Sequence, residues 1–203
     1  GVIVDLHERL AASRSAHARD MRDLTVRELQ VRFDVDAEQA LRVRTAATAL
    51  MRAACPDLDS EALRELAWAC DLHEVGLMVS HHEHHRHGAY LVSNVDAAGF
   101  SQSQQRRIAD LVLAQRGGLG KVDALLDQGA AAWMVLALRL AVIKCHTRND
   151  IDAKALTLQR DGDQAHLRFS PAWAAGHPRT MHLLREEAAT WQGRNSLKLA
   201  LPA

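Results

Sequence analysis

Residues 72–76 read Leu72-His73-Glu74-Val75-Gly76, a histidine beside a carboxylate at the end of an apolar helical pattern. Adjacent residues on a helix point about 100° apart, so His73 and Glu74 reach one metal ion only in a special local setting. Histidine and carboxylate side chains are nevertheless common ligands of divalent metals. This stretch therefore raises the question of whether the surrounding helices hold a metal ion.

Helical patterns surround this stretch, from about residue 2 to residue 148. Apolar side chains recur at helical spacing, and Asp36 with Gln39 has the form of a capping box at the start of one helix. The segment 129–148 is apolar on nearly every side, which predicts a helix buried at the centre of a bundle. The predicted helices are 16–33, 36–55, 59–72, 101–115, 121–127 and 129–148.

The pattern changes after Asn149. Residues 156–158 and 166–169 alternate apolar and polar side chains on the two sides of Asp161-Gly162, a strong signal for a hairpin turn. The rest of the chain is predicted as a loop, a helix and a third alternating segment, at 171–178, 180–191 and 196–201. The fold class is therefore mainly α, with a small α+β subdomain at the C-terminal end.

The composition limits the function classes. A chain of 203 residues with 48% hydrophobic and 25% charged residues is one globular domain, with or without a small appendage. The 25 Lys and Arg balance 25 Asp and Glu, so a polyanion site has to be a local patch. Aromatic residues are only 4% of the chain, so we expect no specific nucleic-acid partner. No apolar run is long enough for a membrane helix, no signal peptide is visible, and three cysteines without CxxC spacing favour free thiols. These features predict a cytoplasmic protein.

The His73-Glu74 pair resembles the metal-binding His-Asp pair of the HD phosphohydrolase fold. Four positions hold the metal in that fold: a histidine on an early helix, the His-Asp pair and a late aspartate. The corresponding positions here hold Gln39, His73, Glu74 and Val142. Two ligands do not hold a catalytic metal with an open position. The resemblance therefore implies a degenerate HD-like helical domain, over 1–150, with no catalytic residue and no metal of its own.

Basic residues gather in one half of the chain. The segment 80–148 contains eight Lys and Arg against five acidic residues, and begins with a histidine-rich tract at 80–87. This tract could bind a polyanion, bind a metal, or be a solvated loop. Arg139 interrupts the apolar segment 129–148, so it is harder to interpret as a solvated charge. Arginine suits a polyanion site because its planar fork binds phosphate oxygens bidentately.

The run from residue 73 to residue 118 resembles the Ppx/GppA family of exopolyphosphatases and guanosine pentaphosphate phosphohydrolases, in their C-terminal region. The matching motifs are Leu72-His73-Glu74-Val75-Gly76-Leu77, Ser80-His81, His85-Arg86-His87-x-Ala89-Tyr90-Leu91, Asn94-x-Asp96-x-x-Gly99-Phe100-Ser101 and Leu111-Val112-x-x-x-Arg116. The resemblance favours His81, His85 and His87 over the extra His82 and His84. The family also has basic residues at the positions of Gln115 and Gly117, so these two changes reduce the basic lining.

The resemblance implies a division of labour. Family members carry catalysis in N-terminal actin-like (ASKHA) domains that use Mg²⁺ or another divalent metal, and this chain matches the region on the C-terminal side of those domains. We therefore expect the C-terminal part of a longer enzyme: an HD-like domain over 1–150 and a small α+β subdomain over 151–203. The residues implied for polyphosphate binding are His81, His85, Arg86, His87, Arg116, Arg139 and Arg148.

Three functions remain open from the sequence. The first is a non-catalytic module that binds inorganic polyphosphate and forms a homodimer, and whose affinity falls steeply with salt. The second is an autonomous HD-type metal-dependent phosphohydrolase acting on nucleotides such as guanosine pentaphosphate, which Gln39 and Val142 disfavour. The third is a purely structural dimerisation domain. Whether the chain alone has enzyme activity stays open.

Overall fold

The computed structural model describes residues 21–149, 152, 155–194 and 196–202. Its helical part confirms the predicted helices, although their bounds shift by a few residues. The described part of the predicted helix 16–33 is helical over 21–32, and residues 16–20 lie outside the described residues. The next elements along the chain are α2 (Ala37–Ala54), α3 (Ser60–Asp71), η1 (Val75–Met78), α4 (His84–Asn94), α5 (Gln102–Ala114), η2 (Leu119–Val122), α6 (Asp123–Leu126) and α7 (Ala131–Lys144).

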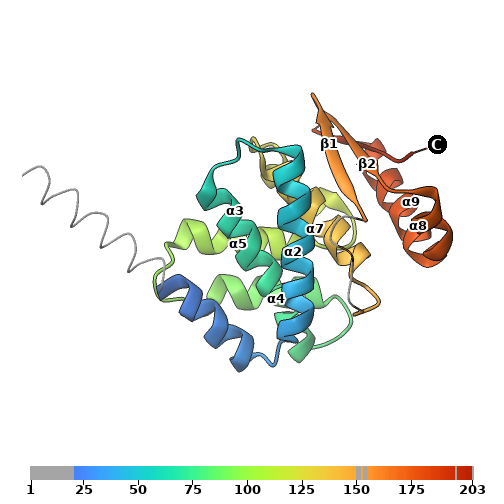
Figure 1. Cartoon of the computed structure of the whole chain (residues 1–203). Helices are drawn as coiled ribbons and strands as arrows, with labels where there is room; N and C mark the ends of the chain where they lie inside the picture. The colour runs from blue at the N-terminus through green and yellow to red at the C-terminus, as the bar shows by residue number, and fades with distance from the viewer. Residues whose placement is uncertain (1–20, 150–151, 153–154, 195, 203) are drawn as a thin grey trace, which may run out of the picture.

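Helix α7 is the central helix, as its apolar sequence predicts. Its side chains from Ala132 to Ala141 are all buried, and it contacts α2, α3, α5 and α6. Figure 1 shows α2 beside it, with α3, α4 and α5 completing the bundle. Burial of this whole helix supplies a large part of the hydrophobic stabilisation of the bundle.

Two helix starts agree with their sequence signals. The Asp36 carboxylate accepts the backbone N–H of Gln39 at 3.0 Å and caps α2. The Gln39 amide does not complete the predicted capping box, because it donates instead to the Cys145 carbonyl at the end of α7, at 2.9 Å. Ser101 and Gln104 form the complete reciprocal capping box at the start of α5.

The close crossing of η1 and α4 depends on Gly76. A Cβ at this position would lie 1.8 Å from the His84 carbonyl oxygen and 2.5 Å from the Gly88 nitrogen. Helix α4 begins directly after Glu83, whose backbone is left-handed with φ 50. Glycine at residue 76 thus lets the histidine-rich segment pack directly against the end of the stretch 72–76, Leu-His-Glu-Val-Gly (LHEVG).

The C-terminal part contains a three-stranded sheet in the order β1 (Thr157–Asp161), β2 (Gln164–Arg168), β3 (Lys198–Ala200). The predicted hairpin is confirmed, since β1 and β2 pair antiparallel with Asp161 opposite Gln164. Gly162 turns the chain with φ 58. Strand β3 pairs parallel to β2, which requires the crossover that lies between them.

The crossover consists of α8 (Pro171–Gly176) and α9 (Pro178–Gln192). The prediction of a loop over 171–178 is wrong, because the Ser170 hydroxyl accepts the Trp173 N–H and Pro171 occupies the first helical turn. Figure 1 shows the sheet with α8 and α9 on one side of the bundle, with α9 in contact with α7. The mainly α fold with a small α+β part is therefore confirmed, while the domain division at residue 150 stays a prediction. No helix in the described ranges is long and apolar enough to cross a membrane.

Candidate functional site

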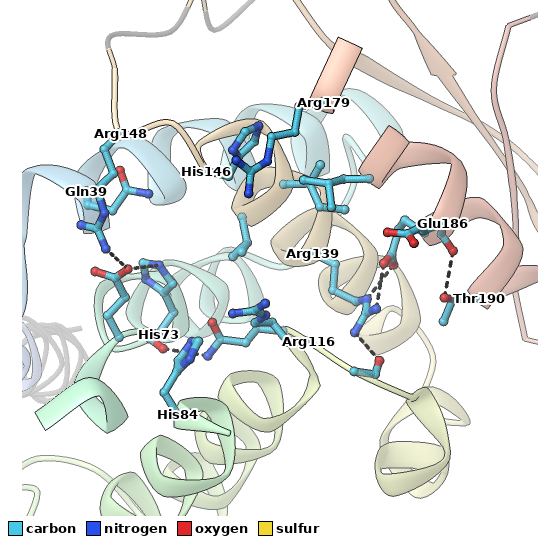
Figure 2. Close-up of a pocket in the computed structure, with 17 residues that line it drawn as sticks. Gln39, His73, His84, Arg116, Arg139, His146, Arg148, Arg179, Glu186 and Thr190 are labelled. Carbon is cyan, nitrogen blue, oxygen red and sulfur yellow. Dashed lines mark hydrogen bonds and ion pairs between the residues drawn. The ribbon is translucent and has the colours of Figure 1, made fainter. Parts of the chain in front are cut away.

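A cavity of about 510 Å³ lies where the bundle meets α9. Its walls come from α2, the segment after α3, the start of α4, the ends of α5 and α7, and α9 (Figure 2). The cavity brings together seven residues that the sequence analysis singled out from two motifs. These are Gln39, His73, Glu74, Arg116, Arg139, Val142 and Arg148.

All four positions of the degenerate HD motif line this cavity, but they do not fit a metal ion. Val142 offers no donor atom, and the Gln39 amide is engaged with the Cys145 carbonyl. In the part of the chain that the structure describes, no cluster of three or more His, Cys, Asp or Glu could hold a metal. Only His73 and Glu74 of the four positions carry metal-ligand chemistry.

His73 is a buried, neutral histidine. Its side chain is 3% exposed, and its Nδ1 lies 2.7 Å from the Cys70 carbonyl oxygen. Because a carbonyl only accepts, Nδ1 carries the proton and Nε2 keeps its lone pair, 3.9 Å from the Glu74 Oε1. Burial lowers the pKa of His73 to about 4, so the ring is uncharged at neutral pH.

Glu74 lies opposite a fixed positive charge. Arg148 donates to the Glu74 carboxylate at 2.5 Å and to the Asp36 carboxylate at 2.8 Å. Burial raises the pKa of Glu74, and the Arg148 guanidinium acts against that rise. The N–H of Gln39 and then Arg148 lower the pKa of Asp36. Arg148 therefore faces the cavity with its charge already balanced by two carboxylates.

The guanidinium of Arg139 is also occupied by contacts within the protein. Its Nε and Nη2 donate to the two carboxylate oxygens of Glu187 at 2.6 and 2.7 Å, and both side chains are about 95% buried, at 6% and 5% exposure. Its Nη1 donates to the carbonyls of Ala114 and Gly117 at 2.8 and 3.0 Å. This arginine holds α9 and the end of α5 against α7. The family resemblance implied Arg139 as a polyphosphate ligand, whereas in the structure its guanidinium donates to protein groups.

Two other arginines at the cavity are exposed. Arg116 comes after α5, and Arg179 lies in the first turn of α9, on a different wall of the cavity (Figure 2). Neither guanidinium forms an ion pair with a carboxylate of the described residues. The exposed Glu186 also lines the cavity, and its carboxylate lies 3.6 Å from the ring of His182, one turn earlier on the same helix. Arg116 and Arg179 are thus the cavity cations that remain available to an anion.

Two neutral histidines complete the basic side of the cavity. Burial and then the Arg116 charge lower the pKa of His84, while burial and then the Arg179 charge lower that of His146. The His146 Nε2 lies 3.0 Å from the Thr180 hydroxyl. An incoming anion would oppose both shifts, because a negative charge favours the protonated ring.

The histidine-rich tract at 80–87 brings a different histidine to the cavity from those that the family resemblance favoured. His81 is exposed, His87 is half-buried, and Arg86 pairs with Glu83 at 2.9 Å. His85 is buried beside Gly117, and burial together with the Lys121 charge lowers its pKa to about 4. None of these four side chains lines the cavity, whereas His84 does. Their part in polyanion binding stays a prediction.

The sequence did not predict that His84, His146, Arg179 and Thr190 line the cavity. His84 lies outside the matched motif, although it occupies the first helical position after Glu83. Arg179 and Thr190 belong to α9, and no local pattern connects that helix with the bundle. A signal existed only for His146, which lies near the end of the apolar segment 129–148, two residues after α7.

Comparison with known proteins agrees with this interpretation of the motifs. Residues 21–188 match the family described as Ppx/GppA phosphatase, domain III. The match covers the helical bundle, the hairpin and most of α9, and so includes every wall of the cavity. It confirms the resemblance that the LHEVG and His-Arg-His motifs indicate. The chain therefore belongs to the Ppx/GppA phosphatase family.

Proposed function

We propose that this chain is a non-catalytic module that binds inorganic polyphosphate in the cavity between the bundle and α9. In this proposal, N-terminal ASKHA domains with a divalent metal such as Mg²⁺ hydrolyse the terminal phosphate of an exopolyphosphatase-like enzyme. The observation that carries the proposal is the pair Arg116 and Arg179, two exposed guanidinium groups on different walls of one cavity with no carboxylate partner among the described residues.

The charge balance of the cavity favours an anionic ligand at its exposed side. Arg139 and Arg148 face three carboxylates, those of Glu187, Glu74 and Asp36, so this inner side carries one negative charge in excess and adds no attraction for an anion. Arg116 and Arg179 outnumber the one exposed acid, Glu186. A guanidinium binds two phosphate oxygens at once, and a chain of phosphates offers such pairs at every unit. A flexible polyanion can therefore contact both walls together.

The autonomous metal phosphohydrolase has less support. It needs a metal with an open coordination position, and the HD-like wall supplies only His73 and Glu74 of the four ligands. Release of phosphate from guanosine pentaphosphate by the purified chain, with stoichiometric bound metal, would restore it.

Homodimer formation in the cytoplasm is part of the proposal. Support for an interface comes from apolar side chains that stay exposed on the helix at 21–32 and on α2. Leu24, Val31 and Leu41 are 54%, 83% and 50% exposed. Side chains of this kind on neighbouring helices suit a protein–protein contact. Sedimentation velocity of the purified chain tests this part, since a monomer at micromolar concentration would contradict it.

The binding experiment is a titration with long-chain polyphosphate, with orthophosphate as the comparison. We expect the double variant Arg116→Ala/Arg179→Ala to lose at least about tenfold in affinity for long chains. The control Arg52→Ala/Arg106→Ala removes the same charge from two exposed arginines that do not line the cavity. Equal losses in both double variants would show that net charge, rather than the cavity, determines binding.

A further inference from the structure

We propose that Arg139 and Lys121 are positioning residues, which hold the backbone at 114–117 so that the Arg116 side chain is presented to the cavity. This inference rests on the proposed function, because it concerns how one of the two available cations meets an anion. Neither positioning side chain contacts the ligand in this proposal. The Arg139 guanidinium is occupied by protein groups, and Lys121 does not line the cavity.

The first argument is the set of contacts at the end of α5, where three backbone carbonyls around Arg116 accept from cationic side chains. The Arg139 Nη1 donates to the carbonyls of Ala114 and Gly117, at 2.8 and 3.0 Å. The Lys121 Nζ donates to the carbonyl of Arg116 itself, at 2.5 Å. The last carbonyls of a helix lack partners within the helix and carry partial negative charge, so cations stabilise this end. Two side chains therefore fix the backbone on both sides of Arg116.

The second argument is the glycine that follows Arg116. Gly117 has φ 72, in the left-handed region that favours glycine. A Cβ at this position would lie 3.3 Å from the Lys121 Nζ, so glycine leaves room for the ammonium beside the Arg116 carbonyl. Burial, and then the charges of Arg139 and Arg86, lower the pKa of Lys121 to about 8. This shift agrees with two cations that converge on one short segment, whose carbonyls offset their repulsion.

The third argument is the link between this segment and the opposite wall of the cavity. The Arg139 guanidinium that holds the residues around Arg116 also donates twice to Glu187, at 2.6 and 2.7 Å. Glu187 lies on α9, the helix that carries Arg179. One buried guanidinium thus holds both segments that carry the available cations (Figure 2). Fixing these segments before a ligand binds reduces the ordering cost of binding.

The test is a double-mutant cycle between Lys121→Met and Arg116→Ala, with long-chain polyphosphate as the ligand in titration calorimetry. Methionine keeps an unbranched side chain but cannot donate to the Arg116 carbonyl. We expect Lys121→Met to lower the affinity at least about threefold, the factor that preorganisation of one long side chain contributes. With Arg116→Ala already present, the same substitution should change the affinity by less than about 1.5-fold, because no guanidinium remains to be positioned.

Two comparisons separate positioning from other roles of Lys121. The control Lys198→Met removes the same charge from an exposed lysine on β3, outside the cavity, and should leave the affinity within about 1.5-fold at physiological salt. A general loosening of the cavity would couple Lys121→Met to Arg179→Ala as strongly as to Arg116→Ala. Positioning of Arg116 predicts that the effects of Lys121→Met and Arg179→Ala are additive.

A second cycle, between Arg139→Lys and Arg116→Ala, tests the other positioning residue and decides if Lys121→Met does not fold. Lysine keeps a positive charge opposite Glu187, but one nitrogen cannot occupy the positions of the three guanidinium nitrogens. Its effect on affinity should also disappear with Arg116→Ala present. Urea denaturation of each variant shows that the titrated protein is folded.

The outcomes distinguish this inference from the proposed function. If the unaltered chain does not bind polyphosphate, both are overturned. If Arg116→Ala weakens binding but Lys121→Met and Arg139→Lys do not, only this inference is overturned. A loss that persists in the Arg116→Ala background, or an equal coupling to Arg179→Ala, would overturn it as well.

Discussion

The Arg139–Glu187 ion pair couples α9 to the bundle, and its removal gives the sharpest stability test. Both side chains are almost fully buried, and Arg139 makes four hydrogen bonds, two of them to Glu187. The Trp191 indole also donates to Glu187, at 2.6 Å. The substitution Glu187→Ala leaves a buried guanidinium without its counter-charge and an indole N–H without an acceptor.

Breaking a buried pair by removing one partner costs about 3–5 kcal/mol. In a chain of this size, a loss of that magnitude lowers Tm by about 6–20 °C. Urea denaturation followed by Trp fluorescence measures the free energy of unfolding, and Trp191 reports directly on the altered contact. The matched control is Glu186→Ala, the adjacent residue on α9, whose side chain is 63% exposed. The control should stay within about 0.5 kcal/mol of the unaltered chain. A loss below about 1 kcal/mol for Glu187→Ala would refute the assignment of Arg139 to packing.

Two further predictions concern His73 and Gly76. The folded pKa of His73 is about 4, below its ordinary 6.5, so its contribution to stability is complete above pH 6.5 and is lost as the pH falls towards 4. Between pH 7 and pH 5, the unaltered chain should therefore lose about 2 kcal/mol more than His73→Gln in urea denaturation. Burial raises the pKa of Asp71 to about 6, which acts in the opposite direction as the pH rises from 3.8 to 6, but this contribution is common to both proteins. Equal losses in both would contradict a buried neutral His73. The substitution Gly76→Ala should cost more than about 3 kcal/mol, because the new Cβ meets the backbone of α4. Gly118→Ala, where a Cβ meets nothing within 4 Å, should stay within about 0.5 kcal/mol, and similar losses in the two variants would contradict the close crossing.

Much of the fold can be predicted from local patterns in the sequence. The caps at Asp36 and Ser101, the apolar segment of α7 and the turn at Asp161-Gly162 each depend on a few neighbouring residues. Helix α8 was missed because it is only six residues long and buries none of them, so it has no apolar periodicity. Its start signal, Ser170-Pro171, was the only indication.

The cavity could be predicted only in part. The four HD-like positions come together because helix spacing and bundle packing place them at one end of the helices. The contribution of α9 could not be predicted, because it depends on a buried ion pair between residues 48 positions apart. Arg139 in an apolar helix signals a partner or a ligand, and only the structure identifies Glu187 as the partner.

The most direct test of the proposed function is the salt dependence of polyphosphate binding. Dissociation constants for a long chain, measured over a range of salt concentrations, give the slope of log K against log[salt]. For Arg116→Ala/Arg179→Ala the slope should be shallower than that of the unaltered chain by about two, one for each lost phosphate contact. The control Arg52→Ala/Arg106→Ala should keep the original slope. An unchanged slope in the cavity variant would contradict the claim that this cavity binds polyphosphate.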